Sequence, residues 1–380
     1  MKALTAAILL LFIGFNNAAQ NISPTAQQIE ILTRDFYERG QFNGSVLVAK
    51  DGVVVFKKGF SLANREWNAP NQPDTKFQIA SLTKQFTAMI VMQLVEQGKI
   101  RLDGKISDYL PNYPKNNGSR ITIQNLLNHT SGISNYTNLP VWSELSRRSY
   151  TPDQFIKVFA DLNLEFEPGS KFKYSNSGYY LLGVIIEKIT GKPFGKVLRE
   201  NILNPLKMRN TGYASNRAVI NNLAAGYERL PTGFYEKAPY QDLSTAFSEG
   251  GMYSTVEDLH LWDQSLNSDN LLSAKYKKFL FNPNLANYAY GWVVGKASVA
   301  EAREFLTNPF LFSSKESGQK QKLLIWHWGS NPGFNALILR LVDERSLIVI
   351  LDNSELIGEA KGTKVFDMAA DIVEIIYEKK

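Results

Sequence analysis

The chain has 380 residues, of which 44% are hydrophobic, and a formal net charge of +6. This length is enough for a large core and for roughly one to three domains. The basic residues are spread along the chain without a long block, so nucleic-acid binding is not indicated. The absence of cysteine excludes disulfides, a thiol nucleophile, thiolate metal sites and a lipid-modified N-terminal cysteine.

Residues 1–19 have the pattern of a signal peptide. Lys2 is followed by an apolar stretch over 3–15 and then by residues 16–19, which end in two alanines. The apolar part is too short to span a bilayer comfortably. We therefore expect an exported protein, periplasmic or secreted, with cleavage after Ala19 and a mature chain of 20–380 that has no stable membrane span.

The first elements predicted after the leader are a helix, a strand hairpin and a second helix. The helix covers 23–38, and apolar strands over 45–50 and 53–58 are joined by Asp51-Gly52, a strong hairpin turn. The next helix, over 85–97, is apolar on nearly all sides, which indicates a buried helix.

The middle of the chain has mostly helical signals, and strands return near its end. Helices are predicted over 122–128, over 177–189 and after a capping box at 254–257, strands over 291–294, 323–328, 336–341 and 347–352, and a last helix over 364–377. This order predicts an α/β protein of the α+β kind. An antiparallel sheet, at about 20–80 and 285–380, would be flanked by N- and C-terminal helices, with a mostly helical subdomain inserted at about 81–284.

Ser81-Leu82-Thr83-Lys84 opens the buried helix. Ser81 then lies at the helix N-terminus, where free N–H groups favour negative charge, and Lys84 lies three residues on, on the same face. A lysine whose pKa is lowered by burial is a base for a serine nucleophile. The alternative is a simple helix N-cap. The spacing alone does not decide, because it recurs at Ser170 and Ser317.

Further motifs follow in a characteristic order. They are Leu126–Gly132, Tyr174-Ser175-Asn176, Gly250–Thr255 and Tyr290-Gly291-Trp292. Together with Ser81–Lys84 they make the chain, over roughly residues 40 to 353, similar to the superfamily of serine β-lactamases and penicillin-binding proteins, in its class C-like branch. Tyr136-Thr137-Asn138 also fits the tyrosine-x-asparagine motif, but Tyr174 has the surroundings and the distance from Ser81 that this family shows.

The resemblance implies a β-lactamase/transpeptidase-like fold and a set of roles. Ser81 attacks a carbonyl and is acylated, and Lys84 accepts its proton, alone or jointly with Tyr174. Tyr174 also passes a proton to the leaving group. Asn176 holds Lys84 and donates a hydrogen bond to the acyl side of the substrate.

The third family motif, Lys-Thr-Gly, is absent, and His327-Trp328-Gly329 stands in its place. The resemblance implies an oxyanion hole from the backbone N–H groups of Ser81 and Ser330, with Gly329 letting substrate approach the strand. His327 would bind substrate and titrate near neutrality, which predicts an activity change near neutral pH. Trp328 has no hydroxyl for a substrate carboxylate, which argues against strong β-lactamase activity.

Other residues receive ordinary interpretations. We expect a structural role for His129 and an ordinary helix position for His260, and Tyr136, Tyr227 and Phe334 are weak candidates for pocket walls. The three histidines lack metal-ligand spacing, so neither a metal nor a cofactor is expected.

The sequence therefore predicts an exported serine hydrolase that forms an acyl-enzyme on Ser81 and cleaves an amide or ester bond of a small molecule or peptide. The alternatives within this chemistry are a D-Ala-D-Ala carboxypeptidase or penicillin-binding protein and an esterase for small esters. A non-catalytic binder of cell-wall fragments is the alternative from a different class. The sequence does not indicate an oligomeric state.

Overall fold

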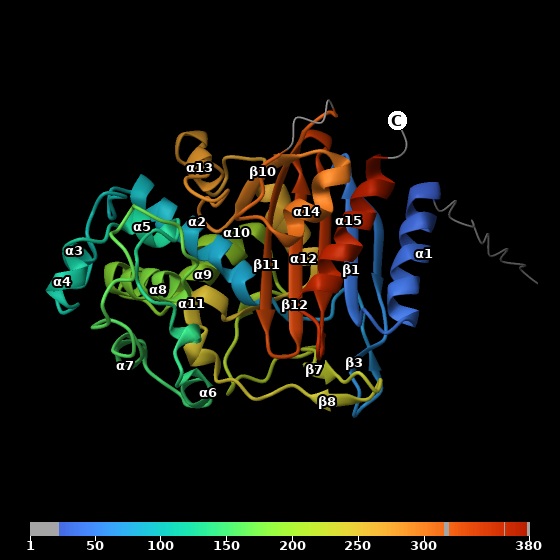
Figure 1. The fold of residues 1–380 in the computed structure, drawn as a ribbon, viewed down its shortest axis with the longest axis horizontal. Coiled ribbons are helices and arrows are strands. Elements are labelled where there is room, and N and C mark those ends of the chain that lie inside the picture. The colour runs from blue at the N-terminus through green and yellow to red at the C-terminus, as the bar shows by residue number, and fades with distance from the viewer. Residues whose placement is uncertain (1–22, 315–318, 361, 378–380) are drawn as a thin grey trace, which may run out of the picture.

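The computed structural model describes residues 23–314, 319–360 and 362–377. The signal peptide predicted at 1–19 lies outside them. A six-stranded antiparallel sheet in the order β10-β11-β12-β13-β1-β2 forms the centre of the protein (Figure 1). Its strands are β1 (Gly44–Lys50), β2 (Val53–Gly59), β10 (Val293–Ala297), β11 (Lys322–Asn331), β12 (Phe334–Leu341) and β13 (Ser346–Asp352).

The two faces of this sheet belong to two different cores, because side chains alternate along each strand. On β13, Ile348 and Ile350 pack into one hydrophobic cluster, while Leu347 and Val349 pack into the other. The first cluster lies under α1 (Pro24–Glu38), α14 (Ala302–Thr307) and α15 (Thr363–Tyr377). The second is shared with the helical part of the chain, so the strands are apolar on both faces.

The helical part lies on one side of the sheet, drawn from light blue through green to orange in Figure 1. Its helices are α2 (Thr83–Glu96), α3 (Ile106–Tyr109), α4 (Lys115–Gly118), α5 (Ile123–Leu127), α6 (Trp142–Leu145), α7 (Pro152–Ile156), α8 (Asn176–Thr190), α9 (Phe194–Leu198), α10 (Asn204–Leu206), α11 (Phe247–Gly250), α12 (Val256–Ser265) and α13 (Ala274–Leu280). Helix α2 is buried along nearly its whole length, as its all-round apolar sequence predicts.

Short strands complete the structure in small sheets. They are β3 (Leu62–Asn64), β4 (Ala69–Pro70), β5 (Phe77–Gln78), β6 (Gly212–Tyr213), β7 (Tyr227–Arg229), β8 (Tyr235–Lys237), β9 (Met252–Ser254) and β14 (Ser354–Leu356). Sheet β5-β9-β6 is important for the site because it joins the segment before α2 to the segment after α11.

The predicted fold class is confirmed, with corrections at the ends of elements. Strand β11 continues to Asn331, three residues beyond the predicted end at 328. The capping box predicted at 254–257 is wrong, since the N-cap of α12 is Thr255, which accepts from the backbone N–H of Asp258, and the Asp258 carboxylate instead accepts from Thr211. Within the described residues, we find no helix that is both long and apolar enough to cross a membrane.

Candidate active site

Ser81 lies in a short 3₁₀ turn, η1 (Ala80–Leu82), directly before α2. The residue before it, Ala80, has a φ of 43°, a left-handed backbone that is strained for a residue other than glycine. The turn presents Ser81 to a cavity of about 780 Å³, a volume typical of small-molecule sites. The predicted nucleophile is therefore exposed to a cavity rather than sealed in the core.

Lys84 lies behind Ser81 and is completely buried. Its Nζ donates to Ser81 Oγ at 3.0 Å, to the backbone oxygen of Glu249 at 2.9 Å and to Glu249 Oε2 at 2.6 Å. The exposed fractions of the two side chains are 0% and 8%. The predicted proximity of Ser81 and Lys84 is confirmed, but Lys84 is also half of a buried ion pair that the sequence analysis missed.

The expected direction of the Lys84 pKa shift is wrong for this reason. Burial by itself lowers the pKa of Lys84, but the negative charge of Glu249 and the nearby phenol of Tyr174 outweigh it and raise the pKa above its ordinary value. Lys84 is thus held as an ammonium in the resting site, not as the free amine that the sequence suggested.

Glu249 lies on α11, a single helical turn that is followed almost directly by strand β9. Phe247, two residues before it, has a φ of 38°, so both segments that build the ion pair carry a strained, non-glycine residue. The only signal in the sequence was position: Glu249 directly precedes the Gly250–Thr255 motif. Its burial depends on the path of the chain, which no local pattern reveals.

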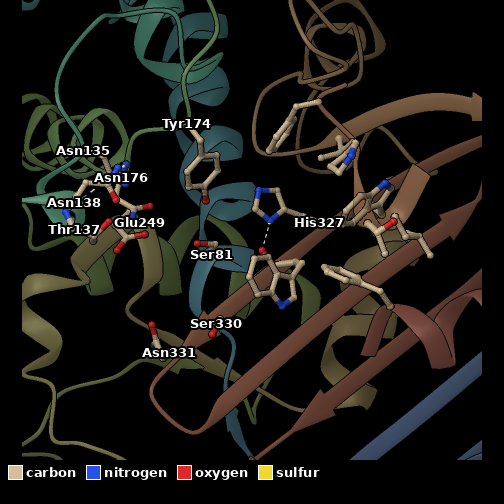
Figure 2. Close-up of a pocket in the computed structure, with 18 of the residues that line it drawn as sticks. Ser81, Asn135, Thr137, Asn138, Tyr174, Asn176, Glu249, His327, Ser330 and Asn331 are labelled. Carbon is tan, nitrogen blue, oxygen red and sulfur yellow. Dashed lines mark hydrogen bonds between the residues drawn. The ribbon is translucent and has the colours of Figure 1, made fainter. Parts of the chain in front are cut away.

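Tyr174 lies beside Ser81, as Figure 2 shows, and Lys84 Nζ lies 5.0 Å from the centre of the Tyr174 ring. Its hydroxyl is within hydrogen-bonding reach of both side chains, and burial raises its pKa although the charge of Lys84 opposes this. His129 packs against the Tyr174 ring at 4.3 Å between centroids, and His129 Nδ1 accepts from the backbone N–H of Ser175. His129 therefore positions the Tyr174 segment, as the structural interpretation predicted.

Asn176 lines the cavity, but it does not hold Lys84. The contacts of Lys84 Nζ among the described residues are with Ser81, Glu249 and Tyr174. The backbone N–H of Asn176 donates to Asn135 Oδ1 at 3.1 Å, and the side-chain oxygen of Asn176 is buried without a partner in the described part of the chain. The lysine-holding role expected of Asn176 is filled by Glu249, and Asn176 keeps a free acceptor beside the cavity.

Gly329 lies on β11 against the Ser81 turn. A Cβ on Gly329 would be 2.4 Å from the backbone oxygen of Ile79 and 2.6 Å from the backbone nitrogen of Ser81. The glycine therefore lets the nucleophile turn approach the strand. The next residue, Ser330, lines the cavity, and its hydroxyl has no partner among the described residues.

His327 is oriented by two hydrogen bonds. Nδ1 lies 2.7 Å from the backbone oxygen of Trp328, and Nε2 lies 3.0 Å from the hydroxyl of Tyr288. A carbonyl oxygen only accepts, so Nδ1 carries the proton and Nε2 accepts from Tyr288. Burial and the charge of Lys84 lower the pKa of His327 to about 3. The expectation that it titrates near neutrality is wrong, and we expect it to be neutral at physiological pH.

The cavity has a polar half and an apolar half. The polar half comes mainly from the helical part and contains Asn135, Thr137, Asn138, Asn176, Gln241 and Glu249. The apolar half comes from the sheet edge, α14, the segment after it and α15, and contains Val293, Leu306, Pro309, Phe310, Leu311, Trp326, Trp328 and Phe366. Among the described residues that line the cavity, none is Lys or Arg, and Glu249 is the sole carboxylate.

The three weak candidates for pocket walls are wrong. Tyr136 is fully buried and contacts Glu249, while Tyr227 and Phe334 are buried elsewhere, and none of the three lines this cavity. His260 lies on α12, as expected. In the described ranges, no group of three or more His, Cys, Asp or Glu side chains is placed to hold a metal ion.

The fold and this arrangement are those of a serine hydrolase. Residues 29–366 match the β-lactamase family, and the chain belongs to this family. Penicillin-binding protein 4* of Bacillus subtilis (strain 168) is 29% identical over 348 residues, which cover 87% of this chain and 72% of the relative.

Solved structures agree with this assignment. A penicillin-binding protein from Bacillus halodurans has a TM-score of 0.73 and 26% identity, with 90% of this chain and 98% of that chain covered. The D-amino acid amidase of Ochrobactrum anthropi SV3, solved with L-phenylalanine amide, has a TM-score of 0.76 at 24% identity, covering 94% of this chain and 99% of that chain. The second likeness is one of fold.

The contact between β11 and the nucleophile turn gives a first prediction. Gly329→Ala places a methyl group against Ile79 and Ser81, so we expect a loss of about 1–3 kcal/mol of stability together with slower acylation of Ser81. Thermal unfolding and covalent labelling of Ser81 measure the two effects. Gly250→Ala is the control, because a Cβ there meets its nearest atom at 3.6 Å. Equal behaviour of the two variants would contradict the prediction.

His327 gives a second prediction, about stability against pH. Its pKa of about 3 in the folded protein lies below the ordinary value of 6.5, so the unfolded chain takes up a proton first on acidification. Stability should fall as the pH falls from about 6.5 towards 3. His327→Asn lacks this contribution, so its melting temperature should drop less between about pH 7.5 and about pH 4.5. Parallel curves for the two proteins would refute the assignment.

Proposed function

We propose that this chain is an exported serine hydrolase that forms an acyl-enzyme on Ser81 and acts on an ester or amide whose leaving group carries no carboxylate. Export is supported by the signal-peptide pattern of residues 1–19. The observation that carries the catalytic part is the Lys84 Nζ contact with Ser81 Oγ at 3.0 Å, at the wall of a cavity.

The mechanism follows from the arrangement around Ser81. Ser81 Oγ attacks the substrate carbonyl and gives its proton to Lys84. The backbone N–H groups of Ser81 and Ser330 are our candidates for the oxyanion hole, supported by the close contact that Gly329 allows between β11 and the turn. Tyr174, which reaches both Ser81 and Lys84, returns a proton to the leaving group.

The charge of the cavity supports the choice of substrate. A carboxylate that loses its water in a site needs a cation or several donors, because an unpaired buried charge is costly. The described lining has no Lys or Arg, His327 is neutral above its pKa of about 3, and Glu249 adds negative charge. An uncharged leaving group on the apolar side fits this cavity better than the carboxylate of a β-lactam or a D-Ala-D-Ala peptide.

Two uses of this chemistry remain as specific candidates. An esterase for small acyl esters is favoured by the apolar half of the cavity. An amidase for amino-acid amides is favoured by the unpartnered side-chain oxygen of Asn176 in the polar half, which suits a substrate with an N–H group. A comparison of N-acetyl-D-Ala-D-Ala with its C-terminal amide separates both candidates from a carboxypeptidase.

Intact-mass measurement after a fluorophosphonate probe tests the acyl-enzyme proposal. Wild type should gain one adduct, and Ser81→Ala none. Lys84→Ala should lose labelling and also be destabilised by about 3–5 kcal/mol, because it leaves the Glu249 carboxylate buried without a partner. Lys84→Met combined with Glu249→Gln removes both charges and should be folded but inactive. Labelling of this double variant at the wild-type rate would reject Lys84 as the base.

A pair of substrates that differ in one charge tests the specificity. N-acetyl-D-Ala-D-Ala and its C-terminal amide differ in the carboxylate alone, and we expect kcat/KM for the amide to be at least tenfold higher, about 1.4 kcal/mol of transition-state binding. p-Nitrophenyl butyrate should also be hydrolysed, with nitrocefin a poor substrate. Preference for the free acid would instead indicate a carboxypeptidase.

A further inference from the structure

The three N–H bonds of the Lys84 ammonium all have an acceptor in the folded protein. Nζ lies 3.0 Å from Ser81 Oγ, 2.9 Å from the backbone oxygen of Glu249 and 2.6 Å from Glu249 Oε2. The nitrogen of an ammonium has no lone pair, so Lys84 in this state cannot accept the proton of Ser81. If Lys84 is the base in acylation, another group must therefore first take one proton from it.

The surroundings of the other Glu249 oxygen fit a protonated carboxyl group. Tyr136 Oη lies 2.9 Å from Glu249 Oε1 and 2.7 Å from the backbone oxygen of Thr245. A phenol has one proton and a carbonyl oxygen only accepts, so Tyr136 satisfies one of these two acceptors while Glu249 is ionised. With a proton on Oε1, Glu249 donates to Tyr136 and Tyr136 donates to Thr245, and both contacts are hydrogen bonds.

The same arrangement satisfies a neutral Lys84. The two N–H bonds of the amine then point to the backbone oxygen and Oε2 of Glu249, and its lone pair faces the hydroxyl of Ser81. In this state Ser81 donates to Lys84, Lys84 to Glu249, and Glu249 to Tyr136. Tyr136 donates to the backbone oxygen of Thr245, so every donor has an acceptor. Lys84 and Tyr136 are fully buried and Glu249 is 6% exposed, so bulk water is a poor substitute for these partners.

We propose that Lys84 and Glu249 act as one base, in which Glu249 holds the proton that Lys84 must release before it accepts one from Ser81. Glu249 acts on the reaction through Lys84 and is a positioning residue in this sense. This inference rests on the proposed function and deepens it.

The proton balance of acylation closes within the site. Ser81 Oγ bonds to the acyl carbon, an electron pair of the C=O bond moves to oxygen, and the Ser81 proton passes to Lys84, which becomes an ammonium beside the Glu249 acid. The C=O bond then re-forms and the bond to the leaving group breaks. The extra proton passes through Tyr174 to the leaving atom, and the pair returns to its starting state. In deacylation, water attacks the acyl carbon and gives its proton to Lys84. The bond to Ser81 Oγ then breaks, and Ser81 Oγ receives the proton.

Other titratable groups face the pair from several elements. They are Tyr136 from η2 (Tyr136–Asn138), Tyr174 from the segment before α8, Tyr179 and Tyr180 from α8, His129 from the loop after α5, and His327 from β11. Burial raises the pKa of the four tyrosines and lowers that of the two histidines. None of these tyrosines and histidines is therefore expected to change its protonation between about pH 5 and about pH 9.

The pH dependence of Ser81 labelling in Glu249→Gln tests the inference. The probe is a fluorophosphonate, and the readout is the second-order rate by intact mass from about pH 5 to about pH 10. We expect a rate at least about 100-fold lower near pH 7 and an acid limb moved to higher pH. Without Glu249, the amine forms only when Lys84 loses its proton to solvent, and that proton has an ordinary pKa of 10.5 that burial lowers.

The opposite result would overturn the inference. If Glu249 merely kept Lys84 charged, its removal would ease deprotonation, raise the rate near neutral pH and move the acid limb to lower pH. A uniform loss of rate with no movement of the limb would indicate a packing role and would also overturn it. A wild-type protein that the probe fails to label would instead reject the proposed function, so the two failures are distinguishable.

Two tyrosine variants form a matched pair for the same measurement and carry the test if Glu249→Gln does not fold. Tyr136→Phe removes the acceptor of the Glu249 proton and should lower the labelling rate about tenfold. Tyr180→Phe loses a similar bond, to the backbone oxygen of Ser244 at 3.2 Å, without a hydrogen bond to Glu249, and should keep the wild-type rate. Equal rates for both variants would overturn the inference.

Discussion

The buried contact between Lys84 and Glu249 is the interaction on which the rest of the site depends. It joins the first helix of the helical part, α2, to the turn α11, and both segments also meet in the small sheet β5-β9-β6. A buried ion pair adds little net stability, because desolvation of two charges offsets most of their attraction. Its effect is therefore greatest on chemistry: it fixes the position and charge of the amine beside Ser81.

The sheet sets the other side of the site by alternation. Ile325 on β11 packs with the helical core, while Leu324 and Trp326 pack towards α15. His327 and Gly329 continue the series of Ile325 and so face the nucleophile turn. Because His327 has both ring nitrogens occupied by Trp328 and Tyr288, this strand supplies shape and neutrality where relatives with the Lys-Thr-Gly motif supply a cation.

The sequence was sufficient for the fold and for part of the site, for identifiable reasons. The apolar strands and the buried helix α2 have strong periodic patterns, and Ser81 with Lys84 is a contact between neighbours on one helical face. Glu249 could not be found this way, since it meets Lys84 across 165 residues of sequence. The direction of the Lys84 pKa shift was wrong for the same reason: burial was predictable, but the partner charge was not.

The neutral histidine and the paired lysine have a common consequence for the reaction. In a cavity with no cation in its described lining, the positive charge nearest to the reacting atoms is that of Lys84, and Glu249 balances it in the resting state. When Ser81 gives up its proton, the pair gains a net positive charge at the moment when the substrate oxygen becomes negative. Electrostatic stabilisation that appears only in the transition state accelerates a reaction more than stabilisation already present with bound substrate. A permanent cation on β11 would stabilise both states, and it would also attract carboxylates, which the proposed substrates lack in their leaving group.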